Sequence, residues 1–167
     1  MLNRNLTWLL SKYIHRKDWL TFLKLNTTFY DSGSLLSSDI DPSIYANYVI
    51  RCAAQNGHEK VVELFLQDPR VDPSAQYDLA IRYAAWFEYA KVIELLLQDP
   101  RVDSSANDNY AIRCAALYGH EKVVKLLLQD PRVDPTIENN FALRYSVKNG
   151  HAKVIELLLQ DSRVKLL

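Results

Sequence analysis

One segment occurs four times in this sequence at a constant interval, and this recurrence constrains the fold more than any other feature. The aspartates that open the four copies are evenly spaced, at Asp41, Asp72, Asp103 and Asp134. The same interval separates the arginines Arg51, Arg82, Arg113 and Arg144. A fixed period of roughly 20–50 residues indicates a protein built of stacked repeats. We therefore divide the chain into an N-terminal segment, 1–40, and a repeat domain, 41–167, with units 41–71, 72–102, 103–133 and 134–164.

The third unit predicts two short helices joined by a glycine turn. Residues 111–117 place apolar side chains at helical spacing. Residues 121–129 are apolar around most of the helix, which indicates burial between neighbours. Gly119 suits the left-handed backbone position that ends the first helix, and Pro131 ends the second helix. We expect Asn109 to cap the first helix with its side-chain oxygen, as its counterparts do in the other units, Asn47, Asp78 and Asn140.

A helix pair of this size cannot bury its own apolar face, so neighbouring units must stack. The motifs that recur are Ala115-Ala116, Gly119-His120, Val123-Val124 and Leu126-Leu127-Leu128. On these residues the chain resembles the ankyrin repeat family over 41–164. The resemblance implies an all-α solenoid of four helix-turn-helix units behind a helical N-terminal segment, with a function in protein binding. The unit departs from the family pattern, because it is slightly shorter than the usual unit of about 33 residues and lacks the Thr-Pro-Leu-His start.

The N-terminal segment lies outside the repeat and predicts two helices followed by a Ser/Gly linker at 31–40. Its apolar spacing resembles a degenerate F-box, the motif that docks adaptors onto cullin-type ubiquitin ligases. The resemblance implies a docking surface for the ligase's linker protein, formed by Leu2, Leu6, Leu10, Ile14 and Leu20. Asn3 and Asn5 depart from the Pro and Glu of that motif. The alternative is that these helices only cover the first repeat.

Composition excludes several classes of function. The net charge is zero, whereas a nucleic-acid-binding domain usually carries a basic surface. No apolar stretch approaches the roughly 20 residues of a membrane span. Cys52 and Cys114 share one unit position two units apart, too far for a disulfide. Free thiols favour a reducing, intracellular compartment, for which we expect the cytoplasm.

The sequence predicts no enzyme, no cofactor and no metal site. His58, His120 and His151 recur at one unit position, which favours a structural role over catalysis. The chain contains no Cys/His spacing of a zinc site and no glycine-rich phosphate loop. The repeated arginines could form an anion-binding strip. We favour a structural role, in which they donate hydrogen bonds to turn carbonyls or to aspartate.

The second unit is unusual and supplies the candidate binding residues. Glu88-Tyr89 replaces the Gly-His pair of its neighbours, so this turn must be strained or reshaped. The resemblance to ankyrin repeats places the preceding positions on the concave groove. We therefore expect a protein-binding surface formed by Trp86, Phe87, Leu117 and Tyr118. Tyr77 and Asp78 would extend it from the adjacent finger, which is the turn that precedes the first helix of a unit. The alternative is that Trp86 folds inward.

The fourth unit has no polar repeat after it, although solenoids normally need one. We expect it to expose apolar atoms of Val154, Leu157, Leu158 and Leu166, and therefore to fray or to self-associate weakly.

Two hypotheses for the function stay open. In the first, the chain is an adaptor whose N-terminus recruits a ubiquitin ligase while the repeats hold a target protein. In the second, it is a plain scaffold or sequestering protein whose N-terminal helices only cap the stack. The sequence does not identify the target.

Overall fold

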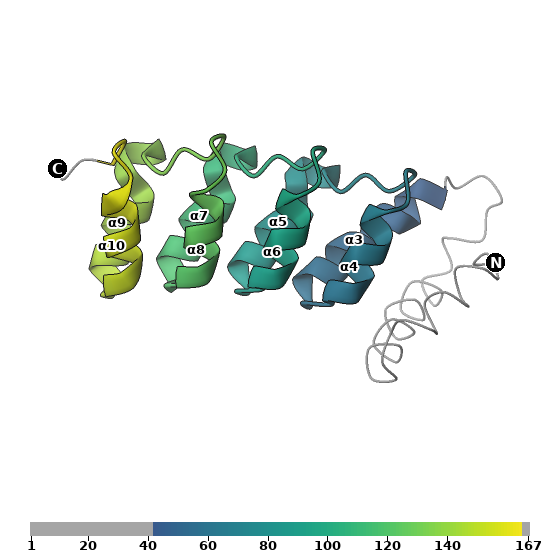
Figure 1. Cartoon of the computed structure of the whole chain (residues 1–167), viewed down its shortest axis with the longest axis horizontal. Coiled ribbons are helices and arrows are strands. Elements are labelled where there is room, and N and C mark those ends of the chain that lie inside the picture. Colours follow the sequence, from purple (N-terminus) through teal and green to yellow (C-terminus); the bar gives the residue numbers. More distant parts are fainter. Residues whose placement is uncertain (1–41, 165–167) are drawn as a thin grey trace.

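The computed structural model describes residues 42–164, which form a row of paired helices (Figure 1). Within this range the helices are α3 (Pro42–Gln55), α4 (Glu59–Leu66), α5 (Ala75–Trp86), α6 (Ala90–Leu97), α7 (Ala106–Tyr118), α8 (Glu121–Leu127), α9 (Ile137–Asn149) and α10 (Ala152–Gln160). The expected all-α class is confirmed. The F-box-like segment, with Leu2, Leu6, Leu10, Ile14 and Leu20, lies outside the described residues, as does Leu166.

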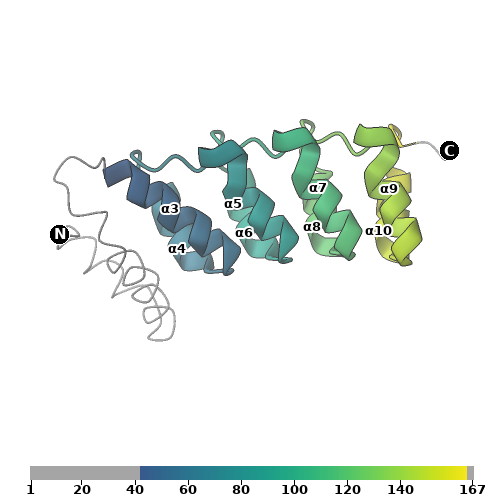
Figure 2. The same ribbon diagram turned by 180° about the vertical axis from the view of Figure 1, so that it is seen from behind.

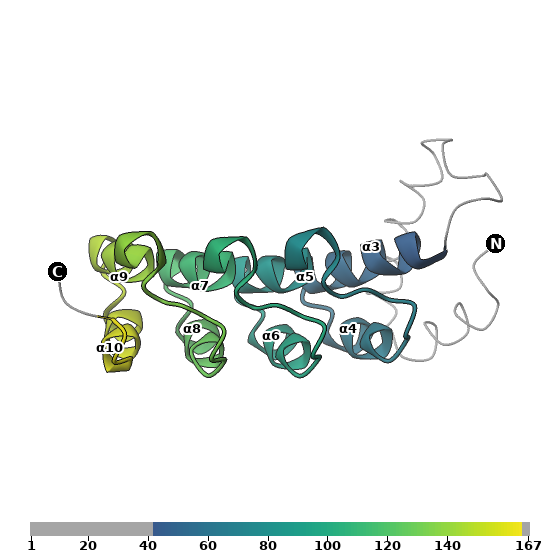
Figure 3. The same cartoon turned by 90° about the horizontal axis from the view of Figure 1, so that it is seen from above.

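The helices form two layers. The first helices of the units, α3, α5, α7 and α9, lie in one row, and the second helices lie in a parallel row (Figure 3). Figures 1 and 2 show this arrangement from opposite sides. Each first helix packs on the next one along the row, and each pair packs within itself. The units are therefore joined side by side into one stack.

The core runs along the stack between the two rows. Second helices contribute bulky side chains, such as Val92, Ile93 and Leu96, which are fully buried. First helices contribute small side chains, such as Ala84 and Ala85, which are fully buried and let neighbouring helices approach closely, together with a buried isoleucine such as Ile81. The two-helix pattern that the sequence predicts thus gives a continuous core of complementary large and small side chains.

A glycine and the histidine of the next unit build the turn between the helices. Gly119 ends α7 with φ 79°, as the sequence predicts. A β-carbon at Gly119 would lie 2.6 Å from the ring of His151. That ring is fixed because its Nε2 lies 3.0 Å from the carbonyl oxygen of Leu117. The repeated histidine is therefore structural at this joint, and His120 makes the same bond to Trp86.

The turn before each first helix differs from the expected cap. Asp103 accepts hydrogen bonds from the backbone and hydroxyl of Ser105, and residues 107–109 then turn left-handed, with φ between 55° and 56°. Asn109 does not cap its own helix. Its Oδ1 accepts the backbone N–H of Asp134, in the next unit, at 2.7 Å. The cap prediction was wrong because the side chain bridges units instead.

The same bridge occurs at the other joints. Asn47 accepts the N–H of Asp72 at 2.6 Å, and Asp78 accepts that of Asp103 at 2.7 Å. Asn140 is the counterpart in the fourth unit, and its buried Oδ1 has no hydrogen-bond partner within the described chain. This position therefore joins each of the first three units to the next one.

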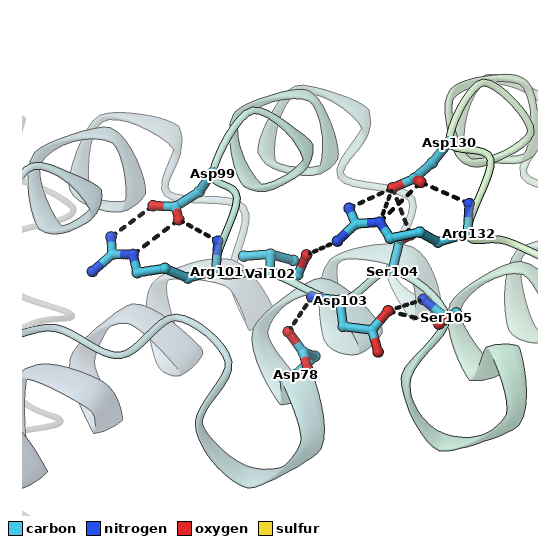
Figure 4. A network of polar contacts seen from close by, with 9 residues as sticks. All are labelled: Asp78, Asp99, Arg101, Val102, Asp103, Ser104, Ser105, Asp130 and Arg132. Carbon is cyan, nitrogen blue, oxygen red and sulfur yellow. Dashed lines mark hydrogen bonds and ion pairs between the residues drawn. The ribbon is translucent and has the colours of Figure 1, made fainter.

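A second link explains the recurring Asp-Pro-Arg-Val motif, except for Ser162, which replaces the proline in the fourth unit. Arg132 pairs with Asp130 at 2.6 Å and also donates to the carbonyl oxygen of Val102 at 2.7 Å, one unit earlier (Figure 4). Arg101 and Arg163 likewise pair with the aspartate of their own unit and donate to the valine carbonyl of the preceding unit, Val71 and Val133. Ser104 donates to Asp130 as well, at 2.7 Å. The arginine thus links the aspartate of its own unit to a backbone carbonyl of the preceding unit.

These aspartate–arginine pairs predict acid sensitivity. The hydrogen bond from Arg132 lowers the pKa of Asp130 to about 2, and the corresponding arginines lower the pKa of Asp99 and of Asp161. A depressed folded pKa contributes stability above the unfolded pKa of about 3.9 and loses it as pH falls toward 2. We expect the urea midpoint to fall over this window. Asp130→Asn should flatten the fall, whereas Asp108→Asn, at an exposed turn, should leave it unchanged.

The C-terminal unit is better packed than the sequence suggested. Val154 and Leu158 were expected to be exposed, but both are buried in the core that α10 forms with α8 and α9. The exposed apolar residues are instead Val147, 58 % exposed, and Leu159, 39 % exposed. Alanine fills the position of Val147 in the other units, where it is buried. Exposure in this unit therefore affects the position that a first helix of the next unit covers elsewhere in the stack, and not the inward face of α10.

The exposure of Val147 and Leu159 predicts local instability in this unit. Residues with fewer packed neighbours open at a lower free energy than the centre of a stack. We expect the amides of α9 and α10 to exchange with deuterium faster than those of α7 and α8, as measured by mass spectrometry. Equal protection in a monomeric sample would contradict this.

Candidate functional site

Four aromatic side chains gather where α5 meets α7, and we call them the aromatic surface, formed by Trp86, Phe87, Tyr110 and Tyr118. The indole of Trp86 lies 6.2 Å from the Tyr110 ring, 5.6 Å from the Tyr118 ring and 6.5 Å from the Phe87 ring, measured between centroids. Trp86 is 38 % exposed, Phe87 44 % and Tyr118 46 %. The surface is therefore a preformed aromatic cluster that remains open to solvent.

The backbone holds Trp86 at this surface. Its carbonyl oxygen lies 3.0 Å from Nε2 of His120, so the end of α5 is tied to the next unit. Glu88 follows with φ 65°, which confirms the expected strain, because a left-handed turn is kept without glycine. Its carboxylate lies 3.5 Å from Nδ1 of His120. The indole consequently projects from a fixed helix end and does not fold into the core.

The other predicted site residues divide into two groups. Leu117 is half-buried, and its carbonyl oxygen accepts a hydrogen bond from Asn149. Tyr77 is 80 % exposed on the finger of the second unit. Asp78 is only 6 % exposed, burial raises its pKa, and its carboxylate accepts the N–H of Asp103. Asp78 therefore belongs to the joint between units and lies outside the aromatic surface.

Tyr110 is the member of the cluster that sequence reasoning missed. It opens the helical part of α7, and its ring stacks on Trp86 of the preceding unit. The guanidinium of Arg82 lies 4.8 Å from its ring centroid. A signal existed, because Leu79 and Phe141 show that this position is apolar in the neighbouring units. The pattern did not reveal that the side chain crosses to the preceding helix.

The repeated arginines lie beside this cluster with different partners. Arg82 donates to the carbonyl oxygen of Tyr77 at 3.1 Å, as the structural interpretation predicts. Arg113 pairs with Glu138 at 2.5 Å, and its guanidinium lies 5.3 Å from the Phe141 ring. Arg144 is exposed, with the ring of Tyr145 at 5.9 Å. The structural role therefore accounts for Arg82 and Arg113 but not for Arg144.

The described residues offer little for catalysis or metal binding. Across 42–164, no group of three or more His, Cys, Asp or Glu side chains could hold a metal ion. Both thiols are free, and burial raises the pKa of Cys114 and of Cys52, which disfavours a nucleophilic thiolate. In the same range, no helix is long and apolar enough to cross a membrane.

Comparison with known families decides the relationship. A family model described as ankyrin repeats, in three copies, matches residues 81–166. The chain belongs to the ankyrin repeat family. The search of curated proteins found no match. Ankyrin repeat domains are typically non-catalytic modules that bind other proteins, and this ankyrin stack carries its aromatic surface on the first-helix row, within the matched region.

Proposed function

We propose that this ankyrin repeat protein is a non-catalytic binding protein, whose target docks on the aromatic surface. The supporting observation is the exposure of Trp86, Phe87 and Tyr118 as one cluster at the centre of the stack. The first and fourth units carry polar residues at the positions of Trp86 and Phe87, namely Gln55, Asn56, Lys148 and Asn149. Ordinary packing of the repeat therefore does not require aromatic side chains here.

Aromatic side chains suit such a role for physical reasons. A few buried Trp and Tyr residues usually carry most of the energy of a protein interface, and they lose little conformational entropy on binding. The bond between Trp86 and His120 fixes the helix end before a target arrives. Tyr77, on the finger of the same unit, is 80 % exposed and offers a second aromatic side chain to a target. An anchor at a fixed helix end suits this role, because little ordering is needed when a target binds.

Trp86→Ala should weaken target binding about tenfold or more with little change in melting temperature. The target is first captured with the full chain and identified, and its affinity is then measured by calorimetry. Gln55→Ala is the matched control, because it changes the same position of the first unit and should leave the affinity unchanged. A large fall in melting temperature with unchanged affinity would instead assign Trp86 to the core.

We further propose that the N-terminal segment recruits a ubiquitin ligase, so that the repeats act as a substrate adaptor. The support is the sequence spacing of Leu2, Leu6, Leu10 and Ile14 before Asp18. Affinity capture with the full chain and with a chain lacking 1–40 tests this. Recovery of a cullin complex by the full chain alone supports the adaptor. If neither chain recovers it, the protein is a plain ankyrin scaffold.

A further inference from the structure

The net charge of zero conceals an uneven distribution of charge over the described helices. After the finger turns, the helical parts of the first helices contain no Asp or Glu. We call the cations on these helices the basic face, formed by Arg51, Arg82, Arg113, Arg144 and Lys148. The second helices carry both signs in equal numbers, with Glu59, Glu63, Glu94, Glu121 and Glu156 against Lys60, Lys91, Lys122, Lys125 and Lys153. The two rows therefore differ in electrostatic character.

Several carboxylates outside the two rows are engaged in contacts of their own, and Glu88 lies beside His120 at the aromatic surface. The aspartates of the Asp-Pro-Arg motif pair with the arginine of the same motif, as Asp99 does with Arg101. Asp78 is buried in a joint between units. Glu138, on a finger, neutralises Arg113 but leaves the other cations. Arg144 and Lys148 are both exposed, and the structure gives neither a carboxylate partner among residues 42–164.

The basic face and the aromatic surface form one continuous strip. Arg82 lies over the Tyr110 ring, and Arg113 lies 5.9 Å from the same ring and 5.3 Å from that of Phe141. In α9, Arg144 and Lys148 occupy the unit positions that Arg82 and Trp86 occupy in α5. Aromatic anchors at the centre of the stack are thus followed by unpaired cations toward its C-terminal end.

From this arrangement we infer that the strip binds an acidic segment of a partner protein, which seats an apolar side chain on the aromatic surface and directs carboxylates to Arg144 and Lys148. The inference rests on the proposed protein-binding function and names the chemistry of its partner. Charge complementarity supports this occupant, because carboxylates are the groups that unpaired guanidinium and ammonium groups attract. A nucleic acid fits less well, because the chain carries no net charge, whereas a nucleic-acid-binding domain usually carries an extended basic surface.

A short synthetic peptide tests the inference on the full chain. In the fluorescein-labelled probe, glutamates flank a central Leu-Phe pair, and binding is followed by fluorescence anisotropy. Two comparison peptides replace every glutamate by glutamine or by lysine. We expect the acidic peptide to bind about tenfold more tightly than the glutamine peptide and the lysine peptide to bind least. Raising the ionic strength to about 0.15 M should reduce this preference, since charges are screened beyond about 8 Å.

Charge reversal locates the binding site. The double variant Arg144→Glu with Lys148→Glu should weaken binding of the acidic peptide about tenfold or more and should improve binding of the lysine peptide. The matched control is Lys60→Glu with Lys122→Glu, which changes the net charge equally on the second-helix row and should leave both affinities within about twofold. Circular dichroism confirms that each variant is folded.

The possible outcomes separate this inference from the proposed function. If the glutamine peptide binds as tightly as the acidic one and Trp86→Ala abolishes both, the aromatic surface binds protein and the acidic partner is wrong. If the double reversal on α9 changes the acidic peptide no more than the control does, the basic face is not the site. If a single-stranded oligonucleotide displaces the acidic peptide and binds more tightly, the ligand is a nucleic acid and the inference fails.

Discussion

Gly119→Ala is expected to lower the free energy of unfolding by roughly 2–4 kcal/mol, as measured by urea denaturation. Two effects add. A residue with a β-carbon at φ 79° costs about 1–2 kcal/mol, and the added carbon would lie 2.6 Å from the ring of His151. That ring is held by its bond to the Leu117 carbonyl, so it cannot move without losing this bond. Overpacking of this kind typically costs about 1–3 kcal/mol.

Gly150→Ala separates the two effects. Gly150 has φ 74°, close to that of Gly119, but an added β-carbon there meets no atom within 4 Å, because no following histidine covers it in the described chain. We expect a loss of only about 1–2 kcal/mol from the backbone alone. Equal losses for the two variants would show that the histidine does not press on the glycine. The truncation His151→Ala should partly rescue Gly119→Ala, because it removes the ring that the added carbon would meet.

Asn109→Ala is expected to destabilise the fold by roughly 1–3 kcal/mol. The substitution removes the acceptor of the Asp134 backbone N–H at the joint between the third and fourth units. A buried donor without a partner costs its full desolvation free energy. Chemical denaturation should therefore show a lower midpoint with a nearly unchanged slope, since the fold and the surface it exposes stay the same.

Asn140→Ala is the matched control for this prediction. Asn140 occupies the same unit position with similar left-handed backbone angles, but its Oδ1 has no partner within the described residues. Its replacement should cost clearly less than that of Asn109, because it removes no bond between units, whereas the cost of alanine at a left-handed position is common to both variants. If the two asparagines proved equally important, the bridge between units would not be the reason that this position is polar.

The constant period of the sequence was enough to predict the helix pairs, the glycine turns and the burial of the second helices. These features repeat with the sequence, and each depends on neighbours that the same pattern supplies. Glu88 was also identifiable, because it replaces a glycine that the turn requires. The structural role of the histidine followed from its recurrence, although its carbonyl partner did not.

The errors concern contacts that cross between units. Asn109 and Asp78 look like helix caps in a local window, but their partners lie in the following unit. Tyr110 joins the aromatic surface because Trp86 of the preceding unit lies beside it, which no single unit shows. Val154 and Leu158 were assigned to an exposed end, although both side chains are buried. A repeat pattern specifies each unit more directly than the relation between two units.

The joints also give the stack a direction. In the described chain, the later unit donates each hydrogen bond to or from the backbone that crosses a joint, and the earlier unit accepts it, as Asp134 donates to Asn109 and Arg132 donates to Val102. Every internal joint in the described chain therefore has the same polarity, with donors on the later unit and acceptors on the earlier one. Duplication or deletion of one whole unit would rejoin matching donors and acceptors, so the gene for such a stack can change its length in whole units without creating an unpaired joint.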